Sequence, residues 1–188
     1  MTRKNSIKRN TFELDIQWIN EVQVNLSAVE RRTISLTKRR TVKKEFQVAW
    51  LLKAITMLDL TTLNGDDTFG KIDKLCQKAL NPISEVILQN LELQSNTLRV
   101  GAVCVYHDLV ARAKEKLKDK LPTAVVSTGF PAGLSSLQTR KKEIINSINN
   151  GADEIDVVIN RAHVLRNEWT KLYDEVREFK EVAKGKKI

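Results

Sequence analysis

The sequence predicts an α/β fold built on a parallel sheet, either a small open sheet or about half of an eight-unit barrel. From residue 54 onward, short and nearly all-apolar runs alternate with segments whose apolar residues recur at helical spacing. Strands of that composition are typical of parallel sheets covered by helices. The units number about four, whereas a complete barrel needs eight and about 250 residues.

Composition narrows the class of protein. The chain has 188 residues, of which 41% are hydrophobic and 29% charged, as in a soluble globular protein. No apolar stretch approaches the ~20 residues of a membrane span, and the basic amino terminus leads into no secretory apolar segment. The two cysteines and two histidines match no metal-ligand spacing. We therefore expect a cytoplasmic protein with reduced thiols and neither metal nor cofactor.

Residues 1–50 are predicted to form a helical extension before the main domain, which spans residues 51–188. Apolar residues from Phe12 to Val22 follow a possible N-cap at Thr11. A second helix is expected from about Ser27 to Trp50. The extension is expected to pack on the main domain through its aromatic side chains, which are Trp18, Phe46 and Trp50.

The densest basic stretch, RRTISLTKRRTVKK, runs from Arg31 to Lys44 in a chain of net charge +9. Such a stretch is found both in surfaces that bind nucleic acid or acidic lipid and in ordinary solvated helix faces. Its charges alternate with Ile34, Leu36 and Val42, and no aromatic side chain stands among them. The pattern favours the solvated face, so we expect no nucleic-acid partner and no membrane.

Four strand–loop–helix units follow in order. Each pairs an apolar run with a helical pattern: AITMLDL (54–60) with 67–80, RVGAVCVY (99–106) with 107–118, TAVVST (123–128) with 138–151, and EIDVVIN (154–160) with 168–185. Gly151 stands where a helix C-cap is expected. The segment RAHVLRN (161–167) is predicted to be a loop.

Two aspartates lie within predicted strands. In EIDVVIN, Ile155 and Val157 face one side and Asp156 faces the other, and Asp59 lies within an apolar run. A buried carboxylate needs a cation, hydrogen-bond donors or a proton. The four strand runs contain no lysine, so we expect the cationic partners beyond the end of this chain, which favours half a barrel over an open sheet.

A structural role remains an alternative for both acids. Asp59 is also compatible with an Asx-turn that accepts backbone N–H groups, as we expect of Asp66 and Asp67 before the next helix. For Asp156 the structural alternative is an acid at the end of a strand whose carboxylate accepts hydrogen bonds from backbone N–H groups.

Four motifs, LDLTTLNGDDT, AVCVY, STGFPAG and GADEIDVVIN, occur in this order at the spacing of βα units. Together they resemble the amino-terminal half of deoxyribose-phosphate aldolase, and the run TVKKEFQVAWLLKAITMLDLTTL resembles the animal-type members in particular. The resemblance implies a (β/α)₈ TIM barrel, here about its first four βα units. It also implies a metal-free cleavage of 2-deoxy-D-ribose 5-phosphate to glyceraldehyde 3-phosphate and acetaldehyde, through a Schiff base on a lysine.

The resemblance assigns roles to six residues. Asp156 matches the family aspartate that manages proton transfers. The substrate pocket is matched by five others, each expected at the carboxyl end of a predicted strand, as is usual in barrel enzymes: Asp59, Thr61, Leu63, Cys104 and Phe130.

The family's Schiff-base lysine lies on the sixth strand and its second lysine on the seventh. The present sequence ends at EVAKGKKI, about where the fifth strand is expected, and Lys53 does not substitute. We therefore expect the chain to be a truncated or incomplete form that is inactive alone. The alternative is a non-catalytic product that self-associates through open barrel edges, or binds a partner or an acidic polymer. A flavodoxin-like sheet for a phosphate ligand is disfavoured because no Gly-rich phosphate loop opens a helix.

Overall fold

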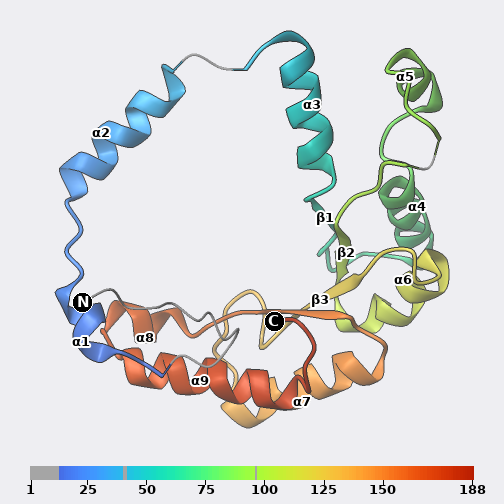
Figure 1. Cartoon of the computed structure of the whole chain (residues 1–188). Coiled ribbons are helices and arrows are strands. Elements are labelled where there is room, and N and C mark those ends of the chain that lie inside the picture. Colours follow the sequence, from blue (N-terminus) through green and yellow to red (C-terminus); the bar gives the residue numbers. More distant parts are fainter. Residues whose placement is uncertain (1–12, 40–41, 96) are drawn as a thin grey trace.

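Four strands form one parallel sheet in the order β1-β2-β3-β4, and it lies to one side of the open middle of the molecule (Figure 1). The structure is a computed structural model that describes residues 13–39, 42–95 and 97–188. The elements are α1 Ile16–Glu21, α2 Leu26–Thr37, α3 Lys44–Ile55, β1 Asp59–Thr61, α4 Phe69–Leu80, α5 Glu85–Asn90, β2 Ala102–Val105, the 3₁₀ turn η1 His107–Leu109, α6 Val110–Leu117, β3 Thr123–Ser127, α7 Leu137–Asn149, β4 Glu154–Val157, α8 Arg161–Leu165 and α9 Trp169–Val182.

Each strand pairs in parallel with the next one along the chain. Thr61 pairs with Cys104, Cys104 with Ala124, and Ala124 with Glu154. Sequential parallel pairing through crossover helices is the arrangement of a (β/α) barrel wall. The predicted parallel sheet of about four units is therefore confirmed.

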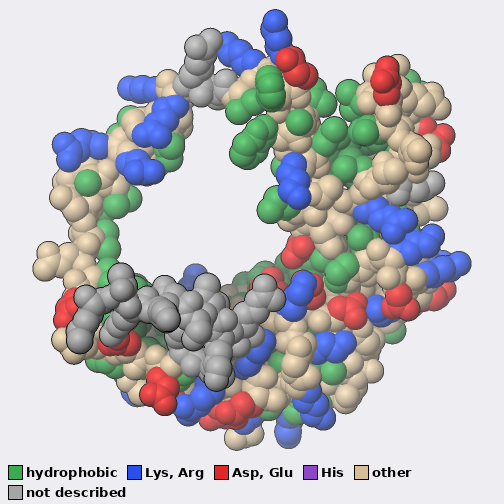
Figure 2. All heavy atoms as spheres, viewed as in Figure 1, with side chains coloured by type: hydrophobic (Ala, Val, Ile, Leu, Met, Phe, Trp, Pro, Cys, Tyr) green, Lys and Arg blue, Asp and Glu red, His purple; other side chains and the backbone are tan. Residues whose placement is uncertain are grey.

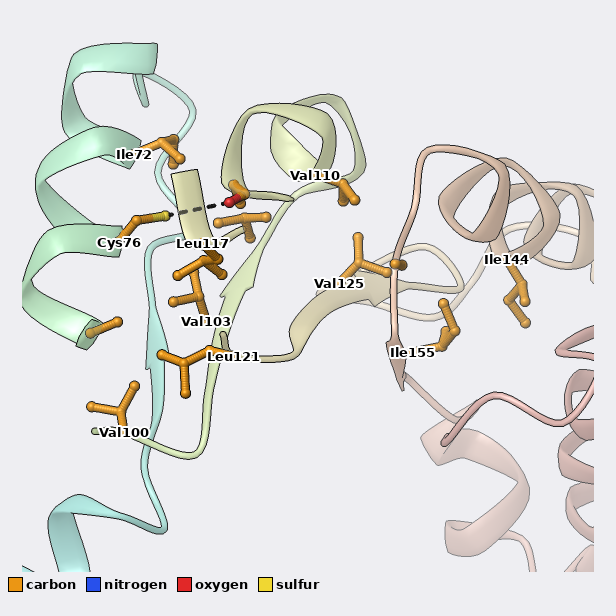
Figure 3. Close-up of a cluster of buried hydrophobic side chains, with 14 of the residues drawn as sticks. Ile72, Cys76, Val100, Val103, Val110, Leu117, Leu121, Val125, Ile144 and Ile155 are labelled. Carbon is orange, nitrogen blue, oxygen red and sulfur yellow. Dashed lines mark hydrogen bonds between the residues drawn. The ribbon is translucent and has the colours of Figure 1, made fainter. Parts of the chain in front are cut away.

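One face of the sheet, here called the outer face, is covered by α4, α6, α7 and α9. The side chains that fill this interface belong to one buried cluster (Figure 3). Cys76 of α4 lies in this cluster, with its sulfur 3.9 Å from the carbonyl oxygen of Ala113 in α6. Full burial of a side chain such as Ile72 or Phe179 stabilises the fold by about 1.5–3 kcal/mol.

Local sequence sets the ends of the outer helices. The Thr68 side chain accepts from the Lys71 N–H at the start of α4, and the Ser136 side chain accepts from the Thr139 N–H at the start of α7. At the end of α7, Gly151 has a φ of +98° and its N–H donates to the Ile148 carbonyl. The predicted glycine cap is confirmed, because a left-handed residue at this position favours glycine.

The amino-terminal helices differ from the prediction. Where one helix was expected from about residue 27 to 50, α2 ends at Thr37 and α3 begins at Lys44. Helix α2 stands apart from the βα units across a wide opening, whereas α3 leads directly into β1 and its Ile55 packs against the core (Figures 1 and 2). The expected cap at Thr11 and the apolar Phe12 lie outside the described residues.

The aromatic side chains of this extension do not pack on the sheet. Trp18, Phe46 and Trp50 are 65%, 65% and 69% exposed, so the predicted packing is wrong. The physical reason is that the outer face of the sheet is already covered by α4, α6, α7 and α9. Hydrophobic side chains of α3 instead face solvent (Figure 2).

Three element predictions also need correction. Residues 54 and 55 belong to α3, so β1 begins at Asp59 and not at residue 54. The segment 161–167, predicted as a loop, contains the short helix α8, and α5 was not predicted.

No helix within residues 13–39, 42–95 and 97–188 is long and apolar enough to cross a membrane.

Candidate active site

The second face of the sheet, here called the inner face, carries the predicted site residues. Alternation along the strands places Leu60, Val103 and Ile155 in the outer-face packing. Their neighbours therefore face inward, which confirms the prediction that Asp156 lies opposite Ile155. The inner face presents Asp59, Thr61, Ala102, Cys104, Ala124, Val126, Glu154 and Asp156.

A small apolar cluster lies at the middle of the inner face. Its buried members are Cys104, Ala124 and Val126, and Leu63 and Phe130 pack against it. Tyr106 also packs there, with its ring centroid 6.0 Å from that of Phe130 and an interplanar angle of 70°. The fold thus brings together three residues, Leu63, Cys104 and Phe130, that stand on three different βα units.

The carboxylates lie at the two edges of the sheet, Asp59 on β1 and Asp156 on β4. Both side chains are exposed. Partial burial, and then the negative charges of Glu154 and Asp156, raise the pKa of Asp59 above its usual value. The two edge strands therefore direct carboxylates into one shared electrostatic environment.

Asp59 does not lie at the carboxyl end of its strand, contrary to the prediction. It is the first residue of β1, and Thr61 is the last. The reason is that α3 and the turn after it occupy residues that were predicted to begin the strand. The Thr61 hydroxyl donates to the Asp59 carbonyl oxygen at 2.8 Å. Neither Asp59 nor Asp156 forms an ion pair with any residue that the structure describes.

The Cys104 thiol is set between these acids. Burial, followed by the charges of Asp156 and Asp59, raises its pKa to about 11. A thiol in that condition is protonated at neutral pH and is a poor nucleophile. Its position in the apolar cluster fits a role in the wall of a pocket.

Lys187 is a cation near this face that the sequence reasoning missed. Its Nζ lies 2.5 Å from Glu154 Oε1, and its carbonyl oxygen accepts from the Ile155 N–H at 2.8 Å. Its charge lowers the pKa of Asp59, in opposition to the burial and the acids that raise it. The expectation that the cationic partners of Asp59 and Asp156 lie beyond this chain is thus incomplete for Asp59. The sequence feature that could have indicated this cation is the basic run KGKKI at residues 184–188.

The loop after β1 separates structural acids from candidate site acids. Asp67 accepts from the Thr62 hydroxyl at 2.9 Å and from the Asn64 N–H at 3.0 Å, and it pairs with Lys71 at 2.5 Å. The predicted turn role is therefore confirmed for Asp67. Asp66 is exposed, and its side chain has no hydrogen bond among the described residues, so the same expectation for Asp66 is wrong. Nor do the described residues include a group of three His, Cys, Asp or Glu able to hold a metal ion.

Sequential parallel strands, an outer layer of helices and an inner face bearing acids, a thiol and an aromatic residue define part of a (β/α)-barrel protein. Residues 53–188 match the DeoC/LacD family aldolase. The chain belongs to this family.

Similar proteins agree with this assignment. The deoxyribose-phosphate aldolases of Homo sapiens and Mus musculus are each 51% identical over 174 residues, which is 91% of this chain and 55% of each relative. The chain thus spans about half the length of the curated relatives it matches. Among solved structures, the aldolase QR15 superposes with a TM-score of 0.56 at 20% identity, over 70% of this chain and 52% of that one. That likeness shows the fold.

Proposed function

We propose that this chain supplies the acid half of a deoxyribose-phosphate aldolase active site. The reaction is the reversible cleavage of 2-deoxy-D-ribose 5-phosphate to glyceraldehyde 3-phosphate and acetaldehyde. The observation that carries the proposal is the inner face, where Asp59 and Asp156 flank the cluster of Cys104 and Phe130. Relatives that are 51% identical and bear the name of this enzyme support it.

In this proposal Asp156 moves protons at the reacting carbon, because an exposed carboxylate on an inner barrel face can take and return a proton. Asp59 and Thr61 hold polar groups of the sugar, and the pocket wall is formed by Leu63, Cys104 and Phe130. The nucleophile is a lysine that forms a Schiff base with the sugar carbonyl. The strands β1–β4 carry no lysine on the inner face, so this lysine is expected on a barrel segment outside residues 1–188.

A fusion tests the catalytic assignment. The chain is joined at its carboxyl terminus to the part of the Homo sapiens relative that follows the matched region, and deoxyribose 5-phosphate cleavage is measured. We expect the fusion to cleave the sugar, Asp156→Asn to lose at least about 100-fold in kcat, and the exposed-loop control Asp66→Asn to retain activity. A folded but inactive fusion, or an Asp156→Asn variant that is as active as the parent, contradicts the proposal.

The 188-residue chain alone is expected to be inactive. Borohydride reduction in the presence of deoxyribose 5-phosphate checks this. The imine forms with loss of water, and its reduction to a secondary amine leaves a stable adduct that adds the mass of the sugar phosphate, or of acetaldehyde after cleavage, less one oxygen atom. We expect no adduct on the chain and an adduct on the active fusion. A trapped adduct at any lysine of residues 1–188 overturns the expectation.

We also propose that the chain alone self-associates. Among the described residues, no strand pairs with the outer edge of β1, and the outer edge of β4 is paired only by a short bridge from Glu154 to Lys187. Helix α3 also exposes Phe46, Trp50 and Leu51. Size-exclusion chromatography over a range of concentrations is expected to show oligomers, and a monomer at every concentration argues against this.

The described residues of the basic helix α2 offer no observation in favour of binding to an acidic polymer. Two free, buried cysteines are consistent with a cytoplasmic location.

A further inference from the structure

The carboxyl end of β3 contains a strained residue. The ladder between β3 and β4 ends with the pair Ser127 and Val157. The next residue, Thr128, is fully buried and has a φ of +63°, followed by Gly129 at +77°. A β-branched residue in the left-handed region is a conformational outlier and stores strain, which the surrounding structure must offset.

Beyond the last backbone pair of the β3–β4 ladder, the Thr128 side chain forms the hydrogen bonds between the two segments. Its Oγ1 accepts the Val158 N–H at 2.6 Å. The same hydroxyl lies 2.7 Å from the Ser127 carbonyl oxygen and 3.0 Å from the Val158 carbonyl oxygen, so its proton is donated to one of the two. A side-chain hydroxyl thereby fixes the residue that lies two positions after Asp156.

The loop that carries Phe130 is held against the same strand end. The Gly129 N–H donates to Glu143 Oε2 at 2.8 Å, which anchors the loop to α7. At Gly133, an added Cβ would lie 2.9 Å from the Ile159 carbonyl oxygen, so the loop backbone lies directly on the segment after β4. Thr128 is therefore at the junction of the two segments that bear Phe130 and Asp156.

A second fixed point lies further along the same segment. The Asn160 N–H donates to Glu175 Oε2 at 2.9 Å. Glu175 in turn pairs with Arg140 of α7, whose guanidinium carbon lies 5.1 Å from the Phe179 ring centroid. Because Asn160 is anchored by α9, the segment after Asp156 is held by backbone hydrogen bonds at Val158 and at Asn160.

We propose that Thr128 is a positioning residue for Asp156, acting through its hydrogen bond with the Val158 N–H. This inference rests on the proposed function, because it assigns Thr128 to the reaction that Asp156 serves. The hydrogen bonds of the Thr128 side chain are made to backbone atoms of Ser127 and Val158. Its strain and burial are explained if its hydroxyl sets the direction in which the end of β4 presents the carboxylate.

The first test uses the 188-residue chain and amide hydrogen exchange measured by NMR. Thr128→Val removes the hydroxyl while keeping the shape, and Thr128→Ser keeps the hydroxyl. Thr123→Val is a matched control, because Thr123 is equally buried on β3 and its Oγ1 has no hydrogen-bond partner among the described residues. We expect Val158 exchange to be about tenfold faster in Thr128→Val, the scale of one buried hydrogen bond. It should be near the parent rate in Thr128→Ser and Thr123→Val.

The Asp156 side-chain carbon signal is the spectroscopic readout of direction. It should shift in Thr128→Val and return in Thr128→Ser, which a loss of global stability alone does not produce. Unchanged Val158 exchange and Asp156 signal in Thr128→Val overturn the proposal, as does a Thr128→Ser variant that behaves like Thr128→Val. Thr128→Ala replaces Thr128→Val if the latter does not fold.

The second test places the same variants in the fusion described above. Thr128→Val should lower kcat about tenfold with KM within about threefold, because mispositioning of a catalytic group acts on the chemical step. Thr128→Ser should restore kcat. A kcat that is unchanged after correction for the folded fraction contradicts a role in the reaction. If the parent fusion cleaves no sugar, the proposed function fails. The exchange rate of the Val158 amide still tests whether the Thr128 hydroxyl holds the segment after Asp156.

Discussion

Removal of Arg140 is expected to be among the most destabilising single changes in the βα units. The side chains of Arg140 and Glu175 are 6% and 5% exposed and form a buried ion pair between α7 and α9. Arg140→Met keeps a side chain of similar length but leaves the Glu175 carboxylate with the Asn160 N–H as its remaining described partner. Breaking a buried pair from one side costs about 3–5 kcal/mol. We expect the free energy of unfolding to fall by that amount.

The double variant Arg140→Met with Glu175→Gln should be far less affected. It removes both charges, and the glutamine oxygen can still accept the Asn160 N–H. Arg140 Nε and Nη1 have no partner among the described residues, so their desolvation is an existing cost that the double variant relieves. We expect the double variant to lie within about 1.5 kcal/mol of the parent, because neutral replacements of a buried pair are often close to neutral in stability.

Urea unfolding followed by circular dichroism measures these differences, with slopes compared to confirm that the transition is unchanged. Arg177→Met is the matched control on α9, since Arg177 is 54% exposed and pairs with Asp174 within its own helix. The control should lose less than about 1 kcal/mol. A loss below about 1 kcal/mol for Arg140→Met, or a double variant as unstable as the sum of the two single variants, refutes the reasoning.

The remaining predictions concern single buried or charged groups. Thr123→Val should leave the free energy of unfolding unchanged or raise it by up to about 1 kcal/mol, because the lost hydroxyl has no described partner; a loss beyond about 1 kcal/mol in urea contradicts this. Burial raises the pKa of Cys76 and Cys104 to about 11, so at pH 8 iodoacetamide should label both at least about tenfold more slowly in the native chain than in urea, as read by mass spectrometry. The pKa of Glu168 is lowered from 4.5 to about 2, with the Lys171 hydrogen bond as the largest cause. The contribution of the ionised Glu168 to stability is present above pH 4.5 and is lost as the pH falls to about 2. Between pH 4.5 and 2 the free energy of unfolding should therefore fall less in Glu168→Gln than in the parent, and an equal fall in both contradicts this prediction.

The fold was predictable from the sequence where the spacing of apolar residues fits only one type of secondary structure. In α4, apolar residues recur at helical spacing, and the face they form is the one that packs on the sheet: Ile72, Cys76 and Ala79 are buried and Leu75 and Leu80 are partly buried against the core. In β4, the alternation around Asp156 predicted which side chains reach the helix layer. The run AITMLDL was assigned wrongly because a short, uniformly apolar run fits a helix and a strand equally well by periodicity, and its first two residues end α3.

The sequence motifs name candidate site residues, but they do not give the arrangement of those residues in space. Sequence motifs predicted Leu63, Cys104 and Phe130 as members of one pocket, and the structure places them in one cluster. Nothing local in the sequence connects Lys187 to Glu154, which lies 33 positions earlier. Their pairing arises because the segment after α9 returns to the edge of β4.

The sequence by itself determined the alternation of strands and helices, the covered face of the sheet and the family. These follow from side-chain periodicity and motif order, which are properties of neighbouring residues. Only the tertiary structure decided that Thr128 adopts a left-handed conformation and hydrogen bonds with Val158, and that Arg140 and Glu175 meet inside the helix layer. The physical reason is that such contacts depend on how whole strands and helices pack, and close packing gives each buried polar group its partner from a distant part of the chain.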